Sequence, residues 1–268
     1  MDIKKKKKLK AGCFAGIAVT VLAILLLFPH PAYYLSFEDG NDCTEPYRNA
    51  KALTLKESPQ QLTEADWKSA GVVSYDYAGH ISSADGEIVP FSIKSKKAAY
   101  RAAAACAGMM ELDTDCTLRY SPSQTYIYQA ISPSLLGWKY YAFVQFYHDI
   151  PVWNSSVVIR TERFGKPAQL MCNLVHGFSD GLPAEPKLTA DEAKRAFAKG
   201  KLEEPAKNAE PLLAYAAGAD GTPVLAWIIQ NDYGEAAPVD ALTGEILPGF
   251  GEPELPPDLQ FDSEEKES

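Results

Sequence analysis

The stretch YYAFVQFYHDIPVWNSSVVIRTERFGKPAQLMCNLVHG, residues 140–177, decides the fold. It is rich in Tyr, Val, Ile, Phe and Trp, which favour β-strands, and Asp149, Pro151 and Gly165 mark the joints between its strands. We expect four strands in and before this stretch, near 117–131, 138–147, 152–163 and 168–176.

A helix should precede these strands. The segment SKKAAYRAAAACAGMMEL, residues 95–112, has high helix propensity and begins with Ser95, which can cap a helix. Small and apolar side chains recur along one helical stripe, at Ala99, Ala103, Cys106 and Met110. This stripe should face the sheet, so the segment predicts one helix packed on an antiparallel sheet.

A second, smaller unit of the same kind follows. Thr189 to Glu192 form a capping box for a helix over 190–199. Residues 211–247 then read as three strands, with turns at Ala219 to Gly221 and at Thr243-Gly244. The predicted class is α+β, with two successive helix-on-antiparallel-sheet modules, cystatin-like in form, after an N-terminal transmembrane helix.

Two short motifs in these units resemble motifs of known propeptides. The first resembles the Q-x-Y-x-G-I-P-V signature of the fungalysin/thermolysin propeptide family and consists of Gln145, Tyr147, Ile150, Pro151 and Val152. The second resembles the D-x-x-T-G hairpin of the PepSY module and consists of Asp240, Thr243 and Gly244. The resemblance covers roughly residues 95–250 and implies a propeptide-like domain followed by a PepSY-like domain, without the peptidase that such modules accompany.

The chain departs from the family at the glycines of this pattern. Asp149 stands where the family has Gly before I-P-V, and Asn154 and Ser155 stand where it has a pair of glycines. Asp and Asn tolerate left-handed backbone better than other non-glycine residues, so we expect the same turns to form.

Composition and motifs together divide the chain. The predicted parts are a cytoplasmic basic tail (1–10), a transmembrane anchor (11–28), a spacer (29–61), an N-terminal helix and hairpin (62–94), a propeptide-like domain (95–180), a PepSY-like domain (187–250) and a disordered acidic tail (251–268). The hairpin is expected to turn at Asp85-Gly86, and residues 177–186 are expected to be a linker.

No arrangement of residues in the sequence is typical of catalysis. A thermolysin-type zinc site needs two histidines four residues apart on a helix, whereas the histidines here are far apart, at His30, His80, His148 and His176. No Ser or Cys nucleophile with a recognisable signature accompanies His148. We therefore predict a protein that is not an enzyme, with no cofactor, no metal site and no small-molecule substrate.

The N-terminus is typical of a signal-anchor. Six lysines precede residues 11–28, an uncharged apolar run of 18 residues that is just long enough to span a bilayer. The positive-inside rule places the N-terminus in the cytoplasm and the remaining chain outside the cell membrane. The alternative is a cleaved signal peptide and a secreted protein, although Pro29 to Tyr34 offers no clean small-x-small cleavage site.

The exterior part of the chain is strongly acidic. Without the six N-terminal lysines and Asp2, the totals of 26 Lys plus Arg and 35 Asp plus Glu fall to 20 and 34, a net charge of −14. Such a surface repels nucleic acid and anionic lipid, which argues against both as partners. It favours a basic protein as partner.

Four cysteines lie beyond the membrane segment, at Cys43, Cys106, Cys116 and Cys172. An even number in an exported chain favours at least one disulfide, and four cysteines allow three connectivities. Free buried thiols are the open alternative, because Cys106 lies among alanines where a small apolar residue fits.

Aromatic residues crowd two adjacent predicted strands, on both faces of the pleat. One face must belong to the core. If the other face is exposed, it is a partner-binding patch formed by Trp138, Tyr141, Phe143 and Trp153. The alternative is that residues 35–90 or the PepSY-like unit cover it.

These features favour a membrane-anchored extracytoplasmic binding protein. By the resemblance, propeptide modules hold a peptidase inactive and assist its folding. A free-standing version would inhibit, chaperone or localise a secreted peptidase or cell-wall hydrolase. The alternative is a non-catalytic structural or sensory ectodomain in a cell-envelope or sporulation assembly.

The orientation can be tested on intact cells or protoplasts. Because the lysines precede the apolar run, added protease should remove the region beyond residue 35 and leave a tag at Met1 protected. Immunoblotting for the tag and for the ectodomain checks this. Protection of the ectodomain would refute the predicted topology.

Overall fold

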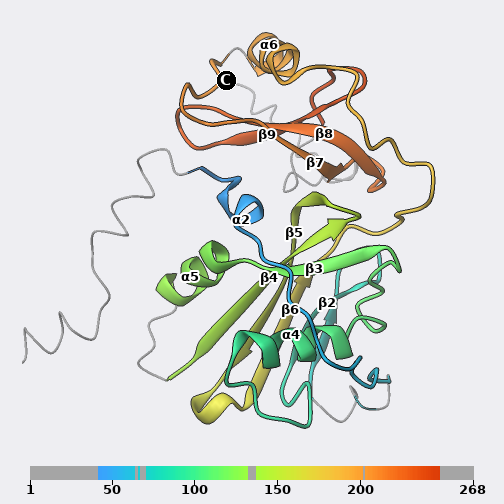
Figure 1. Ribbon diagram of the computed structural model, residues 1–268, viewed down its shortest axis with the longest axis vertical. Coiled ribbons are helices and arrows are strands. Elements are labelled where there is room, and N and C mark those ends of the chain that lie inside the picture. Colours follow the sequence, from blue (N-terminus) through green and yellow to red (C-terminus); the bar gives the residue numbers. More distant parts are fainter. Residues whose placement is uncertain (1–41, 64–65, 67–70, 132–136, 202, 248–268) are drawn as a thin grey trace, which may run out of the picture.

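A long β-hairpin lies at the centre of the structure, a computed structural model that describes residues 42–63, 66, 71–131, 137–201 and 203–247 (Figure 1). Its strands are β4 (Lys139–Tyr147) and β5 (Ile150–Thr161), joined at His148 and Asp149. Both strands are rich in aromatic and β-branched residues, which suit a buried pleated sheet.

Four shorter strands extend this hairpin into an antiparallel sheet. β3 (Cys116–Tyr120) pairs with β4, and β6 (Pro167–Asn173) pairs with β5 after the short 3-10 helix η3 (Arg163–Gly165). β2 (Ile81–Asp85) then pairs with β6, and β1 (Val73–Tyr75) pairs with β2 at the edge. The predicted 62–94 region therefore contributes two strands to the same sheet as the residues that follow it.

Helix α4 (Lys96–Ala105) covers one face of this sheet, as the sequence predicted. Ser95 caps the helix, and its Oγ accepts a hydrogen bond from Ala98 N at 3.2 Å. The predicted stripe is buried, with Ala99, Ala103, Cys106 and Met110 all at 1 % exposure or less. The stripe packs against sheet residues that include Phe143, Ile159 and Leu170.

Two other helices cover the opposite face. α2 (Glu45–Arg48) packs Tyr47 against Val144 and Phe146 of β4. α5 (Pro122–Ile131) stacks Tyr128 on Tyr140, with 6.0 Å between ring centroids. The central strand β4 is thus buried on both faces.

Helix α5 corrects the prediction of a strand over 117–131. The strand ends at Tyr120, and Ser121 with Pro122 then starts a helix. Ser121 Oγ accepts from Gln124 N at 3.3 Å, and proline suits the first turn because a helix leaves its first N–H groups unpaired. The helical turn then brings Thr125 toward β4, where its Oγ1 accepts from the Ala142 amide at 2.9 Å.

The β1–β2 hairpin also turns at a different place from the predicted one. The turn lies at Asp76 to His80, and Asp85-Gly86 instead ends β2. Asp76 Oδ1 accepts from the amides of Ala78 and His80, both at 2.9 Å, and this side-chain turn closes the loop.

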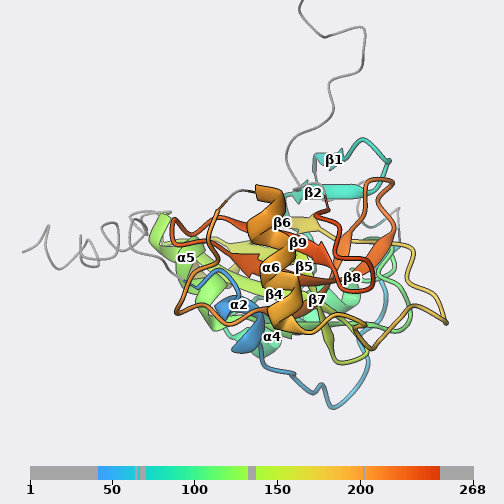
Figure 2. The ribbon, with the colours of Figure 1, turned by 90° about the horizontal axis from the view of Figure 1, so that it is seen from above.

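The C-terminal part is a three-stranded antiparallel sheet under α6 (Ala190–Lys201). Its strands are β7 (Leu212–Ala217), β8 (Pro223–Gln230) and β9 (Ala236–Asp240). The predicted capping box is present, since Thr189 N donates to Glu192 Oε2 at 2.8 Å and Glu192 N donates to Thr189 Oγ1 at 3.3 Å. α6 lies across the strands, on the side away from the rest of the molecule (Figures 1 and 2).

The strand boundaries in this part differ from prediction. The segment 225–240, predicted as one strand, contains most of β8 and all of β9 with a turn between them. In this turn, Asn231 Oδ1 accepts from Tyr233 N and Glu235 N. The segment 241–247, read as the third strand, contributes the bridge between Ile246 and Val239.

The two sheets join through β5 and β7, which pair in parallel at Val152 and Tyr215 to form a nine-stranded mixed sheet. Phe178, from the predicted linker at 177–186, is buried in this joint. The fold is therefore α+β, as predicted, with a mixed sheet and few helices. The joint core consists of Cys116, Tyr147, Val152, Val175, Phe178, Tyr215, Leu225 and Ala241.

Two predicted segments, the transmembrane anchor at 11–28 and the acidic tail at 251–268, lie outside the described residues. Within the described ranges, no helix combines the length and the apolar character that crossing a membrane requires. The helix expected at the start of the 62–94 region also falls largely outside these ranges.

Replacing Phe178 with Ala should separate the unfolding of the two sheets. The ring is 9 % exposed and lies 4.7 Å from the Tyr147 ring and 5.5 Å from the Tyr215 ring, centroid to centroid. Losing a buried Phe costs about 3 kcal/mol or more of unfolding free energy. Calorimetry should therefore show a lower midpoint and two transitions in place of one.

The control is Phe164→Ala, because that ring is 82 % exposed. Its unfolding free energy should change by less than about 0.5 kcal/mol. An unchanged transition in Phe178→Ala would show that the sheets do not depend on this joint.

Candidate functional site

The first predicted signature lies at the joint between the sheets. Gln145 is fully buried in β4, opposite a bulge in β5. Its amide pairs with the backbone of Val175: Nε2 donates to the carbonyl at 2.9 Å, and Oε1 accepts from the N–H at 3.1 Å. The buried Ser155 hydroxyl also hydrogen-bonds to Oε1. Gln145 thus supplies hydrogen bonds that the interrupted ladder does not, which is a structural role.

Tyr147 belongs to a cluster of three rings in the same place. It stacks on Phe178, and both rings meet Tyr215 edge-on at 5.5 Å. The Tyr147 hydroxyl donates to the Ser179 carbonyl at 3.1 Å, and the Tyr215 hydroxyl donates to the Pro183 carbonyl at 2.9 Å. These bonds fix the segment after β6 against both sheets.

Ile150, Pro151 and Val152 open β5 and direct it toward β7. Ile150 and Val152 pack in the joint core, and Val152 makes the parallel pair. The turn before this tripeptide forms at His148 and Asp149, and its left-handed residue is His148 (φ 50°) rather than Asp149. After it, Asn154 is left-handed (φ 55°), as predicted for a residue in place of Gly.

The second signature shapes the turn after β9. Asp240 Oδ1 accepts from Leu242 N at 2.7 Å and from Thr243 N at 3.1 Å. Gly244 has φ 82°, and a Cβ there would lie 3.2 Å from Leu188 Cδ1, in the segment before α6. These residues therefore set the contact between the turn and the start of α6.

The four aromatic residues predicted as a partner-binding patch do not share an exposed face. Tyr141 (8 % exposed) and Phe143 (0 %) lie in the core under α4. Trp138 and Trp153 are half-buried on the opposite face, near α5 and α2 respectively, and Trp153 lies 5.3 Å from the Tyr47 ring. The predicted patch is not present on this sheet, because α2, from the 35–90 region, and α5 cover it.

All four described cysteines are free thiols, so the disulfide favoured by the sequence is not formed. Burial raises the pKa of Cys106 and of Cys172 to about 12 and that of Cys116 to about 11. Burial, and next the Asp42 carboxylate, raise the pKa of Cys43 to about 12. These thiols stay protonated at neutral pH. The three buried ones, Cys106, Cys116 and Cys172, fit the alternative of small apolar core residues.

Exposed apolar side chains gather at the β1 edge of the sheet, which the sequence did not indicate. Val72 is 68 % exposed, Tyr75 60 % and Tyr77 fully exposed. β1 ends the strand order, so in the described part of the chain no strand pairs with its outer side. A local pattern can predict a hairpin here, but its place at the edge depends on the pairing of β2 with β6.

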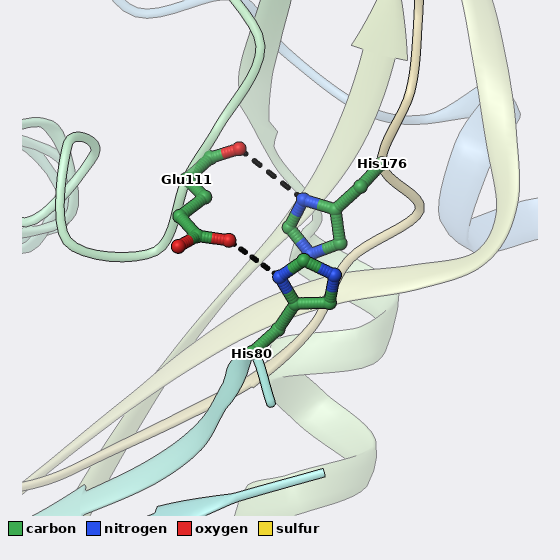
Figure 3. Close-up of side chains that lie close together, drawn as sticks. All are labelled: His80, Glu111 and His176. Carbon is green, nitrogen blue, oxygen red and sulfur yellow. Dashed lines mark hydrogen bonds and ion pairs between the residues drawn. The ribbon is translucent and has the colours of Figure 1, made fainter. Parts of the chain in front are cut away.

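The structure also brings together His80, Glu111 and His176, which the sequence analysis did not connect (Figure 3). His80 Nδ1 lies 2.5 Å from Glu111 Oε2, and His176 Nδ1 lies 3.2 Å from the Glu111 carbonyl oxygen. The imidazole rings stack with 3.9 Å between centroids. The histidines are half-buried and Glu111 is exposed, so solvent reaches the cluster.

Three segments position this cluster. His80 immediately precedes β2, His176 follows β6, and β2 pairs with β6, which places the two histidines side by side. Glu111 comes from the turn after α4, where its backbone is left-handed (φ 54°). The two histidines could have been linked only by predicting that β2 pairs with β6, and the hydrophobic pattern of the sequence does not specify which strands pair.

No protein family model matches the chain, and no curated protein matches it. Among solved structures, the chain is distantly similar to the Bacillus megaterium YpeB C-terminal domain, with a TM-score of 0.34 and 16 % sequence identity. The match covers 63 % of this chain and 71 % of that one.

Replacing Gln145 with Ala should destabilise the chain by about 2–6 kcal/mol. The substitution leaves the N–H and C=O of Val175 buried without their partner, and each such group costs about 1–3 kcal/mol. Chemical denaturation of the purified chain measures the loss. Gln60→Ala, at an exposed position, is the matched control and should change stability by less than about 0.5 kcal/mol. Equal stability of the two variants would contradict a supporting role for Gln145.

Proposed function

We propose that the chain is an extracytoplasmic binding protein, anchored in the cell membrane by residues 11–28, that inhibits, chaperones or localises a secreted peptidase or cell-wall hydrolase. The single observation that carries the binding role is the β1 edge with its exposed side chains Val72, Tyr75 and Tyr77. We call these three residues and the strand between them the edge surface.

The edge surface suits a protein partner for two physical reasons. The outer side of an edge strand has N–H and C=O groups that an extended segment of a partner can pair with. Tyrosine is enriched at protein interfaces because its ring is apolar and its hydroxyl is polar. A register shift between Ser74 and Tyr75 limits regular strand addition to the first part of β1, so the tyrosines would contact the partner through their rings.

Charge favours a basic partner. The exterior part of the chain has a net charge of −14. Two acidic residues lie at the edge surface: Asp76 stands between Tyr75 and Tyr77 in the chain, and the Asp85 amide donates to the Val72 carbonyl. Opposite charges on the partner would speed association and select against acidic proteins.

The class of partner comes from the resemblance to peptidase propeptides. In this proposal, β1 to β6 with α4 form a propeptide-like cystatin-like module, and β7 to β9 with α6 form a PepSY-like module. The presence of Gln145 and Tyr147 at the joint supports this, because the signature residues then maintain the arrangement of the modules. Such modules act by occupying a peptidase, so this chain is proposed to act without catalysis.

Enzyme assays with the purified full-length chain test the proposal. The chain itself should hydrolyse neither casein nor peptidoglycan. It should slow a cognate thermolysin-like peptidase or wall hydrolase as its concentration rises. The double variant Tyr75→Ser/Tyr77→Ser should need at least about tenfold more protein for the same inhibition, since a buried interface aromatic contributes about 2 kcal/mol or more.

Tyr233→Ser is the matched control, because this tyrosine is 83 % exposed but lies on the β8–β9 turn. It should inhibit as the unchanged chain does. No effect on any envelope hydrolase would refute the proposal and favour a structural role in a cell-envelope assembly. Equal inhibition by all variants would refute the assignment of the edge surface.

A further inference from the structure

We propose that His80, Glu111 and His176 bind a divalent transition-metal ion, with Zn²⁺ as the ion that fits best. The set offers two imidazole nitrogens and one carboxylate oxygen. Zinc binds two histidines and a glutamate in known protein sites, whereas Ca²⁺ and Mg²⁺ prefer ligand sets made of oxygen atoms. Three protein ligands would leave a fourth coordination position for water or for a group of a bound partner.

The distances allow one ion to reach all three side chains. One ligand atom from each residue lies within 4.8 Å of the other two. Donor atoms around a tetrahedral zinc lie about 3.3 Å apart, given metal–ligand distances of about 2.0–2.2 Å. Closing the site takes movements of roughly 1.5 Å at the side-chain tips, for which the exposed Glu111 side chain has room. It also takes a rotation of the His80 ring, because the two rings stack with 23° between their planes and an imidazole nitrogen binds a metal within its ring plane.

The hydrogen bond of His176 prepares its ring for metal binding. His176 Nδ1 lies 3.2 Å from the Glu111 carbonyl oxygen, which can only accept. The proton of a neutral His176 therefore lies on Nδ1, and Nε2 has a free lone pair. Histidines that bind metals commonly donate their other nitrogen to a carbonyl or carboxylate in this way, which fixes the ring and its tautomer.

The backbone around His80 is held in place as well. Asp76 binds it twice: Asp76 Oδ1 accepts from His80 N at 2.9 Å, and Asp76 N donates to His80 O at 2.8 Å. The side chain of His80 therefore projects from a closed five-residue turn. A rigid support of this kind lowers the entropy cost of binding an ion.

Glu111 sits in an unfavourable backbone conformation that orients it toward the histidines. Its φ of 54° is uncommon for a residue that is not Gly, Asn or Asp. The turn is closed by a hydrogen bond from Leu112 N to Ala107 O at 3.0 Å. Because such strain often marks functional positions, a glutamate here is consistent with selection for its carboxylate.

Metal titration of the full-length chain, purified through a tag without histidine and then freed of metal with a chelator, tests the site. Calorimetry should show one Zn²⁺ ion bound per chain. Co²⁺ should give visible absorption bands typical of a four- or five-coordinate site and should be displaced by Zn²⁺. The thermal midpoint should rise when Zn²⁺ is added, because an ion that binds only the folded state stabilises it.

Variants locate the ion. His80→Ala, Glu111→Gln and His176→Ala should each weaken Zn²⁺ binding by at least tenfold and remove the Co²⁺ bands. His148→Ala is the control, because His148 is exposed and lies on the β4–β5 turn, and it should bind as the unchanged chain does. Glu111→Gln changes an exposed side chain, so its circular dichroism and metal-free midpoint should match those of the unchanged chain.

Three outcomes of these titrations would overturn the proposed metal site. No Zn²⁺ or Co²⁺ binding by the unchanged chain would overturn the proposal. Binding that persists in the three variants, or that disappears in His148→Ala, would also overturn it. The titrations contain no partner protein and the edge-surface variants keep all three ligands, so this test and the inhibition test fail independently.

Discussion

The hydrogen bonds between the Gln145 amide and the Val175 backbone support much of the structure. They form where the bulge in β5 interrupts the ladder with β4, so the surrounding backbone lacks its regular partners. A side-chain amide has N–H donors and a carbonyl acceptor, as a peptide group does, and can replace a missing strand at this point. Because leaving these buried groups unpaired would cost free energy, the hydrogen bonds keep the segment after β6 against the sheet.

This segment connects the joint with the histidine cluster. Val175 and Phe178 point into the core between the sheets, whereas His176 points toward His80 and Glu111. A change at Gln145 would therefore reach both places through the same backbone. By the same linkage, an ion bound by His176 would stabilise the backbone that carries Phe178, and with it the contact between the two sheets.

Sequence predicted those elements whose cause is local. Ser95 and Thr189 start helices because their hydroxyls cap nearby amides, and Asn154 takes a left-handed position because its side chain tolerates it. The strand expected near 117–131 is wrong beyond Tyr120, because Ser121 and Pro122 begin the helix α5. The predicted aromatic patch is also wrong, because α2 and α5 bury the second face of β4 and the sequence of β4 itself carries no information about these helices.

The histidine cluster could not be found from spacing, because Glu111 is 31 residues from His80 and 65 from His176.

The turn at Asp76 to His80 places a residue of the edge surface next to a residue of the histidine cluster. Tyr77 at its tip is fully exposed and belongs to the edge surface, whereas His80 at its end belongs to the histidine cluster. Asp76 fixes the backbone of both residues, because its carboxylate accepts the hydrogen bonds that close the turn. If His80 binds an ion, the turn is fixed at a second point, and Tyr77 loses conformational freedom before a partner arrives. Since the ordering of flexible surface groups opposes association, metal binding and partner binding would then favour each other through this turn without any direct contact between ion and partner.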